Sequence, residues 1–137
     1  MPIPERCKSK TTNPKIVLEE NISKMVFLNL SRGNVVVVRV DGCAIDNGIR
    51  CDYLVTTDNQ KEHYVELKGS DIDHAVSQIE RSIQHLSVDR QRQEKISFII
   101  STRCPLFTTK IQELKIRFKR QFNSALIIKN RYLEHTL

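Results

Sequence analysis

The spacing of apolar residues changes along the chain and predicts both helices and strands. From Val17 to Leu30 the apolar residues recur at steps of three and four, which would place them on one face of a helix. Arg32, Gly33 and Asn34 then supply the predicted end of that helix. The same spacing recurs in residues 71–87, the best-defined case, and in residues 109–122. We therefore expect three helices.

Three short runs rich in β-branched and aromatic residues lie between the first and second predicted helices. They are residues 35–40, 49–57 and 62–68, joined by the turn-rich sequence DGCAIDNG and by DNQK. Such short connections favour antiparallel neighbours. Apolar runs at residues 96–100 and 124–129 predict two more strands. The predicted order is α-β-β-β-α-β-α-β, an α/β fold with a mixed central sheet flanked by helices.

The chain is long enough for one domain and too short for two ordinary ones, with 137 residues of which 39% are hydrophobic. Residues 16–137 are expected to form that domain. Residues 1–15 hold three of the four prolines and little periodic pattern, which predicts an extended arm. No run approaches the roughly 18 apolar residues of a membrane span, and the N-terminus lacks the apolar centre of a secretory signal. We expect a soluble, cytoplasmic protein without a membrane partner.

The cysteines and histidines give no sign of a zinc site. Their spacings form no CxxC pair, and no histidine joins a cysteine at ligand spacing. The even number of cysteines would allow two disulfides in an oxidising compartment, but nothing else in the sequence indicates one. The thiols are therefore expected to be reduced. His74 and His85 lie on the polar side of their predicted helix and are expected to be solvated.

Candidate chemistry is concentrated on the second and third predicted strands. Residues two apart on a strand point to the same face, so Glu66 and Lys68 should project side by side. Glu113 and Lys115 repeat the same tripeptide, Glu-Leu-Lys, but in a helical pattern that turns them apart. Asp52 lies in the preceding apolar strand, where a buried carboxylate needs compensation. A cation shared with Glu66 would provide it.

This geometry sets a condition on the hairpin that joins the two strands. Asp52 and Glu66 share a face only if the loop holds an odd number of residues, because a slip of one residue moves a side chain to the other face. We predict a three-residue loop within residues 58–61. A regular two-residue turn at Asn59 and Gln60 would count against the site.

Two converging carboxylates, with the carbonyl of Leu67 nearby, form an oxygen-rich site suited to Mg²⁺ or Mn²⁺. Such a cation activates water and neutralises the charge that grows on an attacked phosphate. Lys68 would stabilise the attacking hydroxide and the developing negative charge. A cross-strand charge cluster of small energetic worth is the structural alternative.

The arrangement of Asp52 and Glu66-Leu67-Lys68 on consecutive strands resembles the PD-(D/E)XK, or restriction-endonuclease-like, nucleases. The resemblance covers roughly residues 17–101 and implies an α-β-β-β-α-β core, here followed by an additional helix and strand. Cys51 stands where the motif often has Pro. Many members also place a metal-binding Glu near the start of the first helix, and this chain offers Glu19, the preferred one, or Glu20. Several carry a Gln on the helix after the Lys, which indicates Gln78 as a catalytic candidate; an ordinary role is open for each of these three.

The chain is basic, with 22 Lys and Arg against 16 Asp and Glu and a net charge of +6, which favours a polyanionic partner without identifying it. Positive residues that could contact phosphates follow the second predicted helix, and the alternative for the helical ones is a solvated face. The candidates are Arg90, Arg92, Lys110, Arg117 and Arg120.

The resemblance implies a Mg²⁺-dependent endonuclease that hydrolyses DNA phosphodiester bonds, structure-specific or junction-resolving in some branches. With little outside the catalytic core, a homodimer or a subunit of a larger complex is expected. Two alternatives share these sequence features: an RNA-directed nuclease, and a catalytically silent module that keeps the fold and binds nucleic acid or protein.

Overall fold

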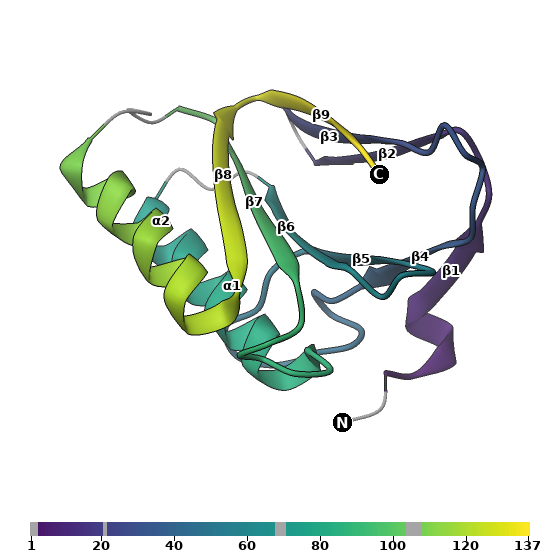
Figure 1. Ribbon diagram of the computed structural model, residues 1–137, viewed down its shortest axis with the longest axis horizontal. Helices are drawn as coiled ribbons and strands as arrows, with labels where there is room; N and C mark the ends of the chain where they lie inside the picture. The colour runs from purple at the N-terminus through teal and green to yellow at the C-terminus, as the bar shows by residue number, and fades with distance from the viewer. Residues whose placement is uncertain (1–2, 21, 68–70, 104–107) are drawn as a thin grey trace.

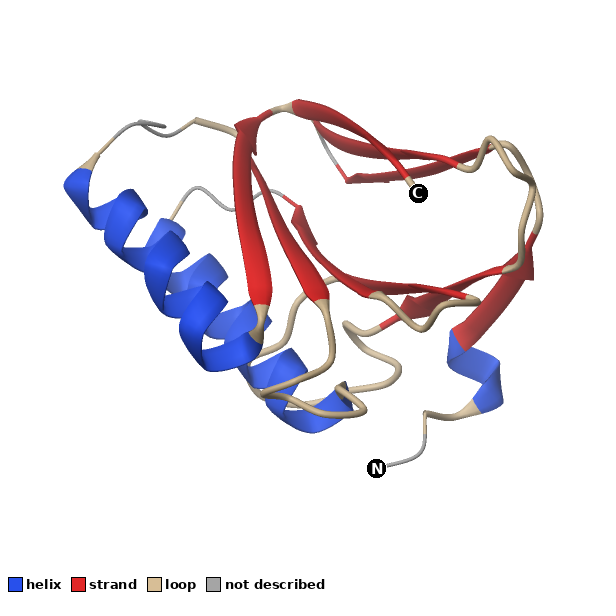
Figure 2. Ribbon diagram, in the orientation of Figure 1, coloured by secondary structure: helices blue, strands red, loops and turns tan. Residues whose placement is uncertain are grey.

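The computed structural model describes residues 3–20, 22–67, 71–103 and 108–137. Within these ranges the chain forms strands, two α-helices and a short 3-10 turn (Figures 1 and 2). In chain order the elements are η1 (Glu5–Cys7), β1 (Lys8–Thr11), β2 (Lys15–Glu20), β3 (Ser23–Leu28), β4 (Val35–Arg39), β5 (Tyr53–Thr57), β6 (Glu62–Leu67), α1 (Ile72–Leu86), β7 (Lys95–Ser101), α2 (Thr109–Phe122), β8 (Ser124–Asn130) and β9 (Tyr132–Thr136).

The strands form two sheets. The larger has the order β1-β4-β5-β6-β7-β8, antiparallel from β1 to β6 and parallel from β6 to β8. The helices α1 and α2 provide the crossovers between the parallel strands, as parallel pairing requires. The smaller sheet has the order β2-β3-β9. The helices lie on one side of the larger sheet and the smaller sheet on the other (Figure 1).

Two apolar clusters fill the spaces on either side of the larger sheet. One packs α1 and α2 against the sheet and includes Ile79, Phe118 and Tyr64. The other packs β2 and β3 against the opposite face and includes Phe27 and Phe98. The uniform burial of β6 and β7 follows from this three-layer arrangement, because both of their faces are covered.

The mixed α/β sheet with flanking helices is confirmed, and so are the second and third predicted helices. Both begin where a side chain satisfies a free backbone N–H: Asp71 accepts from the N–H of His74 and Thr108 from that of Ile111. Asn123 ends α2 in the left-handed conformation, which Asn tolerates well. The described strands β4 to β8 correspond to the five predicted strands.

The first predicted helix is wrong, because β2 (Lys15–Glu20) and β3 (Ser23–Leu28) pair as antiparallel strands. Ile16 and Leu18 are buried while Val17 and Glu19 are exposed, which is the period of a strand. The apolar positions of this segment fit both periods. Long-range pairing decides between them, since β3 pairs with β9, a strand that the sequence pattern did not predict.

The N-terminal segment contains the extended strand β1, which pairs with β4 along the larger sheet. The prediction that all thiols are reduced is wrong, because Cys7 forms a disulfide with Cys43. Both cysteines are buried, and their proximity comes from strand pairing, which cysteine spacing does not reveal. Among the described residues, Cys51 is a free and buried cysteine.

No helix in the described ranges is long and apolar enough to cross a membrane.

Candidate active site

Asp52 and Glu66 lie side by side at one end of β5 and β6. The antiparallel register pairs Tyr53 with Val65, which places Asp52 opposite Glu66 on the same face. Asp52 Oδ2 accepts a hydrogen bond from the backbone N–H of Leu67 at 2.7 Å. The structure thus brings together the two predicted acidic residues.

The connecting hairpin keeps the predicted parity but not the predicted length. Thr56 and Glu62 are the last paired residues, so the five residues 57–61 separate them, instead of three. Gln60 turns the chain with a positive φ of 64°. The N–H of Gln60 donates to the carbonyl of Thr57 at 2.8 Å. An odd number of intervening residues keeps the carboxylates on one face.

The environment of Asp52 raises the pKa of its carboxyl group. Asp52 and Glu66 are only 6% and 3% exposed. Burial, with smaller contributions from the charges of Glu20 and Asp41, raises the pKa of Asp52 to about 6, although the hydrogen bond from the Leu67 N–H acts in the opposite direction. A carboxyl group with a raised pKa in a pocket is a candidate functional group.

A pocket of about 300 Å³ opens above the two carboxyl groups. Its lining combines the loop after β4, the start of β5, the end of β6 and the first half of α1, through Asp41, Gly48, Ile49, Arg50, Asp52, Glu66, His74 and Gln78. His74 is exposed at its edge, in agreement with the predicted solvated position. The buried carboxylates are therefore accessible from a concave and mainly polar surface.

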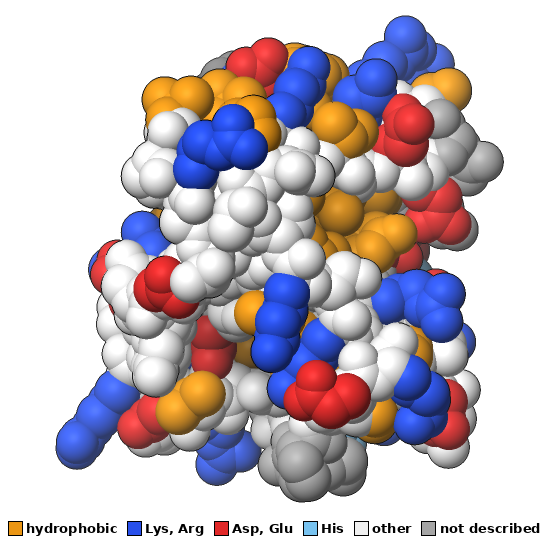
Figure 3. Space-filling view, turned by 90° about the vertical axis from the view of Figure 1, so that its right-hand side faces the viewer, with side chains coloured by type: hydrophobic (Ala, Val, Ile, Leu, Met, Phe, Trp, Pro, Cys, Tyr) orange, Lys and Arg blue, Asp and Glu red, His pale blue; other side chains and the backbone are white. Residues whose placement is uncertain are grey.

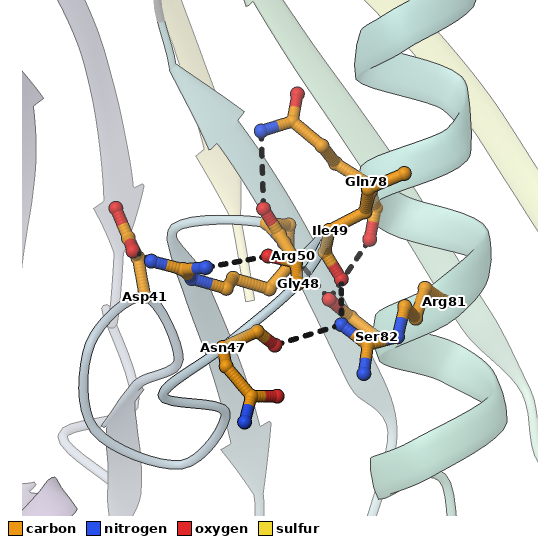
Figure 4. Close-up of polar contacts among 9 residues, drawn as sticks. Asp41, Asn47, Gly48, Ile49, Arg50, Gln78, Arg81 and Ser82 are labelled. Atoms are coloured by element: carbon orange, nitrogen blue, oxygen red, sulfur yellow. Dashed lines mark hydrogen bonds and ion pairs between the residues drawn. The ribbon is translucent and has the colours of Figure 1, made fainter.

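α1 holds the loop that forms one wall of this pocket (Figure 4). Arg81 donates to the carbonyls of Asn47 and Ile49 at 2.9 and 2.8 Å. Ser82 accepts from the N–H of Cys51 at 2.9 Å. Gly48 is required here, because its φ is +78° and a Cβ atom would overlap the Arg81 guanidinium. The loop is thus fastened to α1 directly before Asp52.

Gln78 lines the pocket and also supports its wall. Its side-chain amide donates to the carbonyl of Arg50 at 3.1 Å. Arg50 in turn pairs with Asp41, with 2.8 Å between Nε and Oδ1. These contacts give Gln78 a positioning role in the structure (Figure 4). Its side chain also belongs to the lining of the pocket that contains Asp52 and Glu66.

The two glutamates predicted near the start of a first helix lie instead at the end of β2. Glu19 is exposed and pairs across the hairpin with Lys24, at 3.6 Å. Glu20 is half-buried, and its charge acts on Asp52. The geometry therefore favours Glu20 over Glu19, the reverse of the sequence-based preference, because the strand turns alternate residues to opposite sides.

Leu67 contacts the site through its backbone N–H, which donates a hydrogen bond to Asp52 Oδ2. The predicted role of its carbonyl as a ligand stays a prediction. Lys68 lies outside the described residues, so its predicted position beside Glu66 rests on the sequence.

The predicted phosphate-binding residues lie mainly around α1 and α2, away from this pocket. Lys110 pairs with Asp73 at 2.6 Å and Arg117 with Glu80 at 2.5 Å, so α1 already neutralises these two cations. Arg90 and Arg120 are exposed and line a separate pocket of about 430 Å³, and Arg92 is exposed on the loop before β7.

The donor set fits a hard divalent cation. A cation held between Asp52 and Glu66 could compensate the charges of both buried carboxylates. Across residues 3–20, 22–67, 71–103 and 108–137, no group of three or more His, Cys, Asp and Glu side chains is placed to hold a metal ion. Two carboxylates are nevertheless sufficient for Mg²⁺, which keeps several waters and binds substrate phosphates.

Sequence reasoning missed the residues that build the wall of the pocket, mainly Asp41, Gly48, Arg50 and Arg81. One signal was present. The strands β4 and β5 pair directly, yet residues 40–52 separate them, far more than the two to five residues of an ordinary hairpin. Loops of this length in compact domains are often functional.

Comparison with models of known protein families, with curated proteins and with solved structures finds no match to this chain.

Proposed function

We propose that the protein is a metal-dependent nuclease of the restriction-endonuclease-like class that hydrolyses DNA phosphodiester bonds. The observation that carries the proposal is the juxtaposition of two buried carboxyl groups, Asp52 and Glu66, in the lining of an open polar pocket. Arg50, which also lines the pocket, pairs with Asp41.

The connectivity supports the same class. β4, β5 and β6 form an antiparallel meander, α1 follows, and β7 adds in parallel to β6. This is the β-β-β-α-β part of the expected core. The hairpin β2–β3 stands where the class has its first helix, so a helix-borne glutamate has no counterpart here, and Glu20 takes the nearest equivalent position.

Each residue would have a distinct task. Asp52 and Glu66 would hold the cation, and Gln78 would keep the pocket wall in place through the Arg50 carbonyl. A bound Mg²⁺ would supply an activated water and neutralise the charge on the attacked phosphate. Lys68, two residues after Glu66 on the chain, would stabilise the hydroxide that attacks and the negative charge that develops.

The chain contains a matched control for a test. Glu113 and Lys115 repeat the Glu-Leu-Lys sequence on α2, where Glu113 is exposed. We expect the wild type and the variant Glu113→Gln/Lys115→Ala to cleave supercoiled plasmid or branched DNA with Mg²⁺ or Mn²⁺, and not with EDTA. The variant Glu66→Gln/Lys68→Ala should be at least about a hundredfold slower, which corresponds to about 2.7 kcal/mol.

Equal cleavage by the two double variants would overturn the proposal. Cleavage of RNA but not DNA would transfer the same chemistry to an RNA substrate. Binding of nucleic acid by the folded wild type without cleavage of any substrate would favour the catalytically silent module.

A further inference from the structure

A second pocket lies on the other face of the larger sheet, beside the candidate active site. It measures about 260 Å³ and is lined by Arg6, Cys7, Ser9, Val37, Arg39 and Tyr53. The strand register explains why these side chains meet. Ser9 lies opposite Val37 and Arg39 lies opposite Tyr53, and residues 37 and 39 share a face because they are two apart. The strands β1, β4 and β5 therefore present one continuous surface.

The lining of this pocket has the chemistry of an anion site. Its two charged groups are guanidinium groups, and the hydroxyl groups of Ser9 and Tyr53 add further donors. Arg6 and Arg39 are exposed, and neither forms an ion pair with any carboxylate in the part of the chain that the structure describes. Guanidinium forks match phosphate oxygens in a bidentate manner.

The basic pocket between α1 and α2 is less suited to this role. Arg90 and Arg120 share it with Glu80, and Glu80 already holds Arg117. A phosphate there would have to approach a carboxylate. No Asp or Glu belongs to the lining of the Arg6–Arg39 pocket. The charges of Asp52, Glu20 and Asp41 do act on Tyr53, and that of Arg39 opposes them.

The two pockets adjoin at the same end of β4 and β5. Tyr53 lines one pocket and its chain neighbour Asp52 lines the other. Likewise, Arg39 lines the first of these pockets and Asp41 lines the second. A polyanion that places one phosphate above Asp52 could thus reach Arg39 with a neighbouring phosphate across the end of the sheet.

The disulfide fixes the position of Arg6 relative to the active-site loop. Cys7 follows Arg6 and is bonded to Cys43, which lies in the segment between β4 and the pocket wall. Arg6 is therefore attached covalently to this segment as well as through β1. Figure 3 shows one face of the molecule, on which Lys and Arg side chains lie above and below an apolar area, with Asp and Glu side chains among them.

We propose that Arg6 and Arg39 form a phosphate-binding subsite for the nucleic-acid backbone next to the bond that is cut. This inference rests on the proposed nuclease function and adds to it the path of the substrate: across the end of β4 and β5, and not along α2. The contact would position the backbone without reading its sequence.

The test is the affinity for a short fluorescein-labelled DNA duplex, measured by anisotropy in EDTA over a range of NaCl concentrations. The variant Arg6→Gln/Arg39→Gln should bind about tenfold more weakly and lower the slope of log K against log salt by about 2, near 0.9 for each lost phosphate contact. The matched control Lys10→Gln/Lys15→Gln removes the same charge from two exposed lysines of β1 and β2 and should stay within about threefold of wild type. Arg6→Lys/Arg39→Lys should recover part of the lost affinity.

Equal affinity of the arginine-to-glutamine variant and the lysine control would overturn the subsite. The subsite would also be refuted if the arginine-to-lysine variant bound DNA as weakly as the glutamine variant, because the loss of affinity would then not depend on charge. Failure of the wild type to bind the duplex would refute it as well. Asp52→Asn, assayed separately for cleavage with Mg²⁺, should fail to cut. Cleavage by Asp52→Asn would refute the nuclease proposal and leave the binding result intact, so the two failures are distinguishable.

Discussion

Two buried glutamates on one face of β6, Glu62 and Glu66, differ in the groups that surround their carboxylates. Glu62 accepts from the Tyr64 hydroxyl at 3.0 Å and from the N–H of Val88 at 2.9 Å. Its partner in the register of β7 is Lys95, a buried cation. Glu66 has a second carboxyl group beside it and faces a pocket.

The two ends of β6 therefore differ in their surroundings. At the first end, hydrogen-bond donors and a buried cation surround the carboxylate of Glu62, and the group stabilises the fold. At the second end, two acidic side chains lie together, and burial raises the pKa of Asp52, so its charged form opposes folding at neutral pH. Variants at the two ends should therefore have opposite effects on the free energy of unfolding.

The largest effect on stability is expected from Lys95, which is 1% exposed. Its Nζ lies within 2.7 to 3.1 Å of four backbone carbonyls, those of Asp89, Arg90, Gln93 and Phe122. Lys95→Met would leave these acceptors and Glu62 uncompensated, so the free energy of unfolding should fall by about 3–5 kcal/mol. Urea denaturation measures it, with exposed Lys129→Met as the control. A loss below about 1 kcal/mol would refute the structural role.

Two buried groups should have opposite effects on how the free energy of unfolding changes with pH. Burial lowers the pKa of His63 to about 4, so the unfolded state takes up this proton first and stability falls as the pH drops from 6.5 to 4. Asp52, with its pKa raised to about 6, acts in the opposite direction between pH 6 and 4 because the folded state takes up its proton first.

The variant Asp52→Asn should unmask the effect of His63. Its free energy of unfolding should fall by up to about 3 kcal/mol between pH 6.5 and 4, near 1.36 kcal/mol for each pKa unit. The wild type should change much less in that window. Denaturation curves at a series of pH values measure both, and equal slopes for the two proteins would contradict the raised pKa of Asp52.

At pH 8 without divalent cations, Asp52→Asn should be more stable than wild type by about 1–3 kcal/mol, because the variant has no buried charge at that position. The difference should vanish below pH 4, where Asp52 is protonated in both states. Asp41→Asn, at an exposed acidic position, serves as the control. Destabilisation by Asp52→Asn at pH 8 would show that the pair is structural.

The smallest effect is expected from Glu62→Gln, which retains an acceptor for the Tyr64 hydroxyl or the Val88 N–H but loses the charge near Lys95. A decrease of about 1 kcal/mol in the free energy of unfolding is expected. A gain in stability would mean that Glu62 resembles Glu66 and would remove the contrast between the two ends of β6.

Local signals explain which parts of the molecule were predictable. α1 and α2 carry amphipathic patterns and side-chain caps within their own sequences, and the pairing of Asp52 with Glu66 follows from strand parity. The β2–β3 hairpin was not predictable in this way, because its partner β9 lies near the other end of the chain. The Cys7–Cys43 disulfide likewise depends on tertiary contacts, and so do the hydrogen bonds from Arg81 to the carbonyls of Asn47 and Ile49.

The most direct test of the central claim is Mg²⁺- or Mn²⁺-dependent DNA cleavage by wild type, Asp52→Asn and Glu62→Gln, normalised to folded protein. We predict that Asp52→Asn loses at least about a hundredfold in rate, whereas Glu62→Gln, on the same buried face, stays within a few-fold of wild type. Undiminished cleavage by Asp52→Asn, or no metal-dependent cleavage by the folded wild type, would contradict the assignment of Asp52 and Glu66 as the active site.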